Sequence, residues 1–341
     1  MRCFFDDRQL SHSPEREFHN GGWAVHAEIP DRARSIAKVP GRWEAPRDHG
    51  LAPIAAVHDA RYLAFLQTAW ADWVAEGRTG EAIGYTFPVR HRRALELTRI
   101  DARLGAFSMD ASTPITAGSW DAAYWGAQGA VSAVEALAEG APSSFALCRP
   151  PGHHAGADYL GGYCFLNNAA IAARQATALG LGPVAVLDVD YHHGNGTQDI
   201  FLSDDSVFFA SIHADPRTDY PFYWGHADER GEGAGMGSTF NLPLPRGTDW
   251  AAYRPALAAA LAAIAAWGAR TLVVSFGADT YAHDPIAGFA LETADFVEMG
   301  RMIAQAGLPT AIVMEGGYAV AALGANVAAF LSGIEGDEGA T

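Results

Sequence analysis

Near its middle the chain runs Val184-Ala-Val-Leu-Asp-Val-Asp-Tyr-His-His-Gly-Asn-Gly196, which joins an apolar run to residues that bind metals and transfer protons. The apolar half favours a buried strand, and the acidic and imidazole side chains follow directly at its end. Open α/β sheets build their active sites at the carboxyl ends of their strands. The stretch therefore predicts a sheet of this kind and marks the edge at which function lies.

Four further stretches have the same construction, each following an apolar run. They are Pro151-Gly-His-His154, Ser211-Ile-His213, Phe276-Gly-Ala-Asp279 and Glu315-Gly-Gly-Tyr318. If the five runs are strands of one sheet, their aspartates, histidines and tyrosine meet at one rim. Such a set of residues can make a metal-dependent hydrolase.

From about residue 120 onward, strand and helix patterns alternate. The predicted strands are 145–148, 184–188, 207–212, 271–276 and 310–314, and the predicted helices are 120–139, 167–179, 250–267, 293–306 and 320–331. Short strands that are apolar on both faces and separated by helices are typical of a parallel sheet covered on both sides. No linker divides the chain, so we expect residues 1–341 to form a single α/β domain. Two segments, 78–119 and 215–237, do not fit the alternation, and loops of this length are usually functional or contact a partner chain.

The charge balance and the cysteines of the chain indicate which kinds of partner it binds and in which compartment it resides. Asp and Glu number 39 against 23 Lys and Arg, a formal charge of −16, which argues against binding to a phosphate backbone and is compatible with cationic substrates. Cys3, Cys148 and Cys164 form no Cys-x-x-Cys pair, which favours a reduced, intracellular protein. We see no signal sequence and no apolar stretch of about 20 residues. The expectation is a cytoplasmic protein with no nucleic-acid or membrane partner.

A metal site is predicted from three residues. Asp190 and His192 are two apart, so they face the same side of an extended strand end, and Asp279 ends another predicted strand. Catalytic zinc keeps about three protein ligands and an open position. The set would also accept Fe(II), Co(II) or Mn(II). Asp188 points to the same face and could orient a histidine or bind a second ion. The alternative is a hydrogen-bonded turn without metal.

Proton-transfer groups are predicted beside this site. His153 and His154 follow Pro-Pro-Gly, a turn that can present both imidazoles to a cleft. Amide hydrolysis needs a base for water and an acid for the leaving amine, and one histidine could serve both steps while the other gives electrostatic support. Tyr318 follows Gly316-Gly317 and could donate its hydroxyl to an oxyanion. Taken alone, this tyrosine could equally close a core.

The order and spacing of these motifs resemble the histone deacetylase superfamily, and within it the bacterial acetylpolyamine amidohydrolases. The resemblance implies the arginase/deacetylase fold, a three-layer α/β/α arrangement with a central, mostly parallel eight-stranded sheet. It favours zinc as the metal and implies a structural potassium ion. By the motif match, potassium would be bound by the side chains of Asp188 and Ser211 and by backbone carbonyls of Asp190, His192 and Ile212.

The resemblance also implies partners for the two histidines. His153 would pair with Asp188, and His154 with Asn195. A carboxylate partner stabilises imidazolium, whereas an amide leaves the imidazole closer to neutral. We therefore predict that His153 is the more cationic histidine and that His154 is the general base and acid.

Two segments resemble the family's substrate tunnel. Residues 161–168 resemble its wall loop, with Gly162 and Tyr163 on one side, and Tyr220 is the candidate for the other side. Residues 78–119 resemble an insertion through which acetylpolyamine amidohydrolases dimerise and narrow the entrance. Where polyamine-selective relatives carry glutamates there, this chain has Asp101 and Ser112, with Asp110 nearby.

The predicted function is zinc-dependent hydrolysis of small acylated cationic amines by a homodimer. A broader acyl-lysine or amide deacetylase, similar to class II histone deacetylases, is the alternative within the enzymes. A non-catalytic, ligand-binding member of the fold is the alternative outside them.

Overall fold

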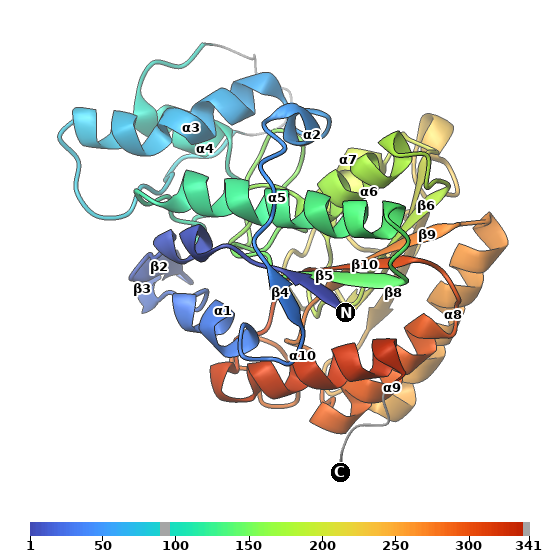
Figure 1. The fold of residues 1–341 in the computed structure, drawn as a ribbon. Coiled ribbons are helices and arrows are strands. Elements are labelled where there is room, and N and C mark those ends of the chain that lie inside the picture. The colour runs from blue at the N-terminus through green and yellow to red at the C-terminus, as the bar shows by residue number, and fades with distance from the viewer. Residues whose placement is uncertain (89–95, 337–341) are drawn as a thin grey trace.

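Eight parallel strands form the centre of the computed structural model, which describes residues 1–88 and 96–336 (Figure 1). Their order across the sheet is β4-β1-β5-β10-β9-β6-β7-β8. The strands are β1 (Arg2–Phe4), β4 (Arg42–Glu44), β5 (Ser143–Ala146), β6 (Val184–Asp188), β7 (Val207–Ala214), β8 (Thr239–Leu244), β9 (Thr271–Phe276) and β10 (Thr310–Met314). A separate antiparallel hairpin consists of β2 (Arg16–His19) and β3 (Gly22–Val25).

Helices cover both faces of the sheet. The helices of the described residues are α1 (Pro30–Ile36), α2 (Ala52–Ala55), α3 (Ala60–Ala75), α4 (Ile100–Ala106), α5 (Ser119–Ala138), α6 (Asn168–Ala178), α7 (Asn195–Phe201), α8 (Trp250–Trp267), α9 (Thr293–Ala304) and α10 (Val320–Glu335). Helices α5 and α6 lie on one face, and α8, α9 and α10 on the other (Figure 1). None of the helices in the described part of the chain has the length and apolarity to span a membrane.

The alternation of side chains along the strands produces the three layers. In β6, Val184 and Val186 pack into the apolar cluster that includes α5 and α6. Ala185 and Leu187 pack into the cluster that includes α8, α9 and α10. All five residues of β6 are buried because successive side chains of a strand point to opposite, covered faces.

The predicted fold class is confirmed, and all strand pairs of the large sheet are parallel. The predicted bounds of β6, β9 and β10 agree with the structure. Strands β1, β4 and β8 were not predicted. β1 and β4 have three residues each, and β8 is a half-exposed edge strand. Helix α10 was predicted to end at residue 331 and continues to Glu335.

The five site stretches belong to strands that are neighbours in the sheet, in the order β5-β10-β9-β6-β7. Four lie at or after the ends of their strands, whereas Ser211-Ile-His213 lies within the last residues of β7, which continues to Ala214 and not only to the predicted residue 212. Because these strands are parallel, their carboxyl ends lie at one edge, as the sequence predicts. In the 78–119 segment the structure has helix α4 and a bridge between Ala82 and Ile115. Residues 89–95 of the predicted insertion lie outside the described residues.

Candidate active site

A pocket of about 440 Å³ opens at this edge of the sheet. Six residues predicted from the sequence line it: His154, Gly162, Tyr163, His192, Tyr220 and Tyr318. They come from loops that follow β5, β6, β7 and β10, which are separated by up to 164 residues in the chain. The pocket therefore brings the predicted proton-transfer, metal and wall residues to one place.

The predicted metal ligands converge. Ligand atoms of Asp190, His192 and Asp279 all lie within 4.8 Å of one another. The Nδ1 atom of His192 is 3.3 Å from Oδ1 of Asp190 and 3.1 Å from Oδ2 of Asp279. The other carboxylate oxygens accept backbone N–H groups, Asp190 from Gly316 at 2.8 Å and Asp279 from Tyr191 at 2.9 Å. Each carboxylate is thus fixed to a neighbouring loop and turned toward the imidazole.

The charge around this point favours a cation. Asp190 and Asp279 are fully buried and meet at one imidazole. Burial disfavours the imidazolium, but the hydrogen bonds with Asp190 and Asp279 outweigh burial and raise the pKa of His192 to about 10. The two carboxylates create a negative potential at this point, and carboxylates together with an imidazole are suitable ligands for a divalent transition metal.

The adjacent histidines have different partners. His153 Nδ1 lies 3.0 Å from Oδ2 of Asp188, and His154 Nδ1 lies 2.7 Å from Oδ1 of Asn195. Burial disfavours the charged form of His153, but Asp190 and Asp188 outweigh it and raise the pKa of His153 to about 10. Burial, together with the charges of His153 and His192, holds the pKa of His154 well below its usual range. This arrangement can place one cationic and one neutral imidazole side by side.

Tyr318 is held by its backbone and by its ring. Its N–H donates to Asp284 at 2.6 Å, and its ring packs edge-on against Tyr163 with 5.7 Å between centroids. The guanidinium of Arg32 lies 4.6 Å from the ring centroid and donates to the carbonyls of Glu315 and Gly317, each at 2.6 Å. The turn that carries Tyr318 is therefore fixed on both sides.

Asp110 organises the walls of the pocket. Its Oδ2 accepts the Tyr220 hydroxyl at 2.8 Å and the Gly162 N–H at 2.7 Å, and its Oδ1 accepts from Ser112 and Thr113. With both oxygens occupied, Asp110 fits a structural role better than the predicted contact with substrate.

Gly162 has φ +53, and a Cβ there would lie 2.1 Å from Cδ2 of His154. Any other residue at position 162 would strain the backbone at this φ and would clash with the imidazole of His154, so glycine is required.

Comparison with known proteins agrees with this geometry. The model of the histone deacetylase domain matches residues 26–334. The chain belongs to the histone deacetylase family. It is 50% identical to acetylpolyamine amidohydrolase 2 of Pseudomonas aeruginosa, over 98% of this chain and 99% of the relative. It is 46% identical to the acetylpolyamine amidohydrolase of Mycoplana ramosa, over 98% of this chain and 100% of the relative. A crystal structure of the acetylpolyamine aminohydrolase from Burkholderia pseudomallei superposes with a TM-score of 0.94 at 41% identity, covering 99% of this chain and 100% of that one.

Asp101, the acidic residue of the insertion that was predicted to contact substrate, lies outside the pocket of this chain. Asp101 does not line the pocket, and its carboxylate accepts from Arg78 at 3.0 Å and from Arg99 at 2.8 Å. Within one chain, Asp101 is therefore paired with two arginines and lies outside this pocket. Ser112 does line the pocket.

Three functional candidates were missed from the sequence. Glu17 and His19, from β2, line the pocket, and Arg32 fixes the Tyr318 turn. The hairpin had a local signal, because Asn20-Gly21 between two short strands is typical of a tight β-turn, and both residues have positive φ. Nothing local indicated that the hairpin reaches the pocket.

Glu315 was recognised in its motif but given no role. It is fully buried, and its Oε2 accepts the N–H groups of Gly152 at 2.6 Å and His153 at 3.1 Å. Its Oε1 accepts the Ser275 hydroxyl at 3.0 Å. Glu315 thus ties the end of β10 to the loop that carries both histidines.

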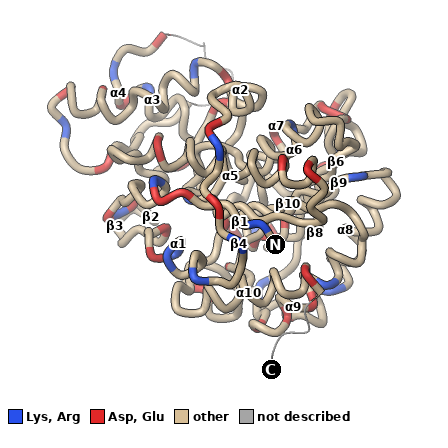
Figure 2. The backbone as a smooth tube through the Cα atoms, in the orientation of Figure 1, with Lys and Arg blue, Asp and Glu red and all other residues tan. Residues whose placement is uncertain are grey.

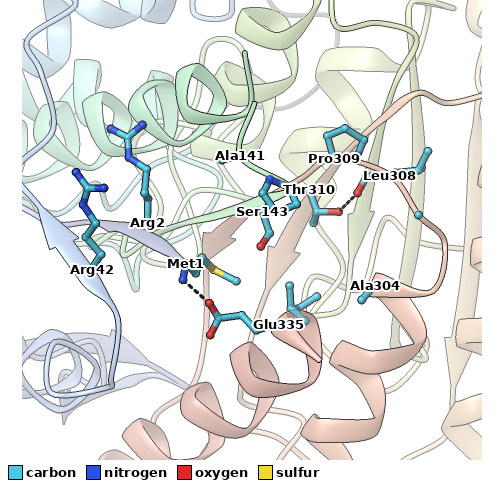
Figure 3. A pocket seen from close by; sticks show the side chains of 13 residues that line it. Met1, Arg2, Arg42, Ala141, Ser143, Ala304, Leu308, Pro309, Thr310 and Glu335 are labelled. Carbon is cyan, nitrogen blue, oxygen red and sulfur yellow. Dashed lines mark hydrogen bonds and ion pairs between the residues drawn. The ribbon is translucent and has the colours of Figure 1, made fainter. Parts of the chain in front are cut away.

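A larger cavity, of about 710 Å³, lies at the opposite, amino-terminal ends of β1, β5 and β10 (Figure 3). Its charged groups already have partners: the N-terminal ammonium pairs with Glu335, and Arg2 pairs with Glu44 and Glu139. It contains none of the residues predicted to act in chemistry.

Proposed function

We propose that this chain hydrolyses the amide of acetylated polyamines or related small acylated amines. The observation that carries the proposal is the convergence, at one pocket, of the Asp190–His192–Asp279 cluster, the histidine pair and Tyr318. The similarity to acetylpolyamine amidohydrolases over nearly the whole chain supports the same function.

Asp190, His192 and Asp279 would bind the metal ion, for which zinc is the expectation from the family. When bound, such an ion acts as a Lewis acid and lowers the pKa of a coordinated water. Fe(II), Co(II) and Mn(II) suit the same ligands.

His154 would be the general base and then the acid for the leaving amine. An amide oxygen can only accept a hydrogen bond, so Oδ1 of Asn195 fixes the proton of His154 on Nδ1. Nε2 is then free to take a proton from water. His153, which its carboxylate neighbours make more cationic, would stabilise developing negative charge beside it.

Tyr318 would donate to the oxyanion. Burial raises the pKa of its phenol well above the usual range, so the hydroxyl keeps its proton and acts as a donor at neutral pH.

A potassium ion and a second chain complete the proposal. Asp188 lies directly opposite Ser211 in the β6–β7 pair, which supports a site made from these side chains and the carbonyls of Asp190, His192 and Ile212. A partner chain at the 78–119 segment would narrow the entrance. Figure 2 shows Lys and Arg residues scattered among Asp and Glu residues, with no basic stripe of the kind that binds nucleic acid. The formal charge of −16 suits a small cationic substrate better.

The test is a substrate panel on zinc-loaded protein. We expect kcat/KM on N-acetylputrescine and on acetylated spermidines to exceed that on an acetyl-lysine peptide by at least tenfold. The reverse order would favour the acyl-lysine deacetylase, and binding without turnover of any amide would favour the non-catalytic protein.

A further inference from the structure

Glu17 is a buried carboxylate without a cationic partner among the described residues. Only 5% of its surface is exposed, although it lines the pocket. Its Oε1 accepts the Tyr163 hydroxyl at 3.1 Å, and its Oε2 has no hydrogen-bond partner. An ionised carboxylate in such a place is costly unless a cation or donors satisfy it.

The groups facing Glu17 do not neutralise it. His26 Nε2 is 3.9 Å from Oε2, but burial lowers the pKa of His26 to about 4, so this imidazole is neutral near pH 7. Tyr163 is a neutral donor, and Asp110 adds negative charge. Among the described residues, no lysine or arginine forms an ion pair with Glu17.

The other acidic candidates are occupied. Asp101 is paired with Arg78 and Arg99 outside the pocket, and both oxygens of Asp110 accept hydrogen bonds within the walls. At the mouth, the insertion contributes the neutral Ser112. Among the described residues, Glu17 is the one carboxylate that lines this pocket, and its buried Oε2 has no hydrogen-bond partner.

We propose that Glu17 binds a protonated nitrogen on the methylene chain of the substrate. Tyr163 fixes Oε1 of the carboxylate while its ring forms the wall, and a rotation of the carboxylate would turn the unpartnered, buried Oε2 toward the ammonium. Within one chain, the cation would thus be recognised by the β2–β3 hairpin and not by the insertion. The inference rests on the proposed function and names its substrate class: amides of diamines and polyamines that remain charged after acylation.

The test compares N-acetylputrescine with N-pentylacetamide, in which a methyl group replaces the ammonium. Wild type should prefer the cation in kcat/KM. In Glu17→Gln, which keeps an acceptor for Tyr163, the preference should fall by about 10- to 100-fold, the range for a hydrogen bond to a charged group. The matched control is Glu15→Gln, which removes the same charge from an exposed position two residues away and should keep the preference.

A structural role for Glu17 makes different predictions. Removing a buried, unpaired charge should leave the melting temperature of Glu17→Gln equal to or above that of wild type. An unchanged preference, or an equal loss on both amides, would overturn the inference. If wild type hydrolyses neither amide, the proposed function fails, and calorimetry with 1,4-diaminobutane then decides: binding to wild type but not to Glu17→Gln supports the cation site, and equal binding refutes it.

Discussion

Replacing Tyr318 by Phe removes one oxygen atom from the pocket and leaves the supports of the ring in place. These supports are the edge-on contact with Tyr163, the guanidinium of Arg32 and the backbone hydrogen bond to Asp284. None of them uses the hydroxyl, which has no hydrogen-bond partner in the described part of the chain. The substitution therefore isolates the donor that we assign to the oxyanion.

The expected loss follows from that role. Removing a single oxyanion donor lowers kcat by about 10²- to 10³-fold, or roughly 2.7–4 kcal/mol of transition-state stabilisation. The free energy of unfolding should change by less than about 1 kcal/mol, because no hydrogen bond within the fold is lost. Steady-state kinetics on N-acetylputrescine, metal content and thermal unfolding measure the three quantities.

Tyr62→Phe is the matched control. The Tyr62 hydroxyl is buried in the core and donates to the carbonyl of Phe165 at 2.6 Å. Its loss should cost about 1 kcal/mol of stability and leave kcat within twofold of wild type. A Tyr318→Phe enzyme with full metal content and kcat within threefold of wild type would refute the assignment.

Three further outcomes are expected. Asp279→Asn, which loses the ligand charge, should retain less than a tenth of the wild-type metal after dialysis, measured by elemental analysis; full retention would contradict the ligand set. Burial raises the pKa of Glu17 to about 7, so its carboxylate is mostly neutral below that pH and charged above it, while an alkylammonium (pKa about 10) stays protonated. The preference for N-acetylputrescine over N-pentylacetamide should therefore rise from pH 6 to pH 8, and a flat profile would argue against this ionisation. Gly162→Ala should lower kcat by about 100-fold by displacing His154, whereas Gly140→Ala, also at positive φ but with open space around it, should lower stability alone.

The sequence was sufficient where local pattern determines structure. Strands β6, β9 and β10 are apolar on both faces, and the polar residues that follow them had to meet once the strands were parallel. It was insufficient where distant segments meet by packing. Glu17 reaches Tyr163 across 146 residues, and Arg32 reaches the carbonyl of Gly317 across 285. The position of a buried arginine or glutamate in the sequence does not predict which distant residue it contacts.

The double use of Asp190 and Asp279 has a consequence for how such a protein can change over time. One oxygen of each secures the main chain of an adjoining loop, and the other is presented to the imidazole. An exchange at either position would alter the shape of the pocket floor along with its affinity for metal. Loop structure and metal affinity are therefore linked at these two positions, whereas changes in the hairpin and the insertion at the rim can alter substrate preference without disturbing the metal ligands.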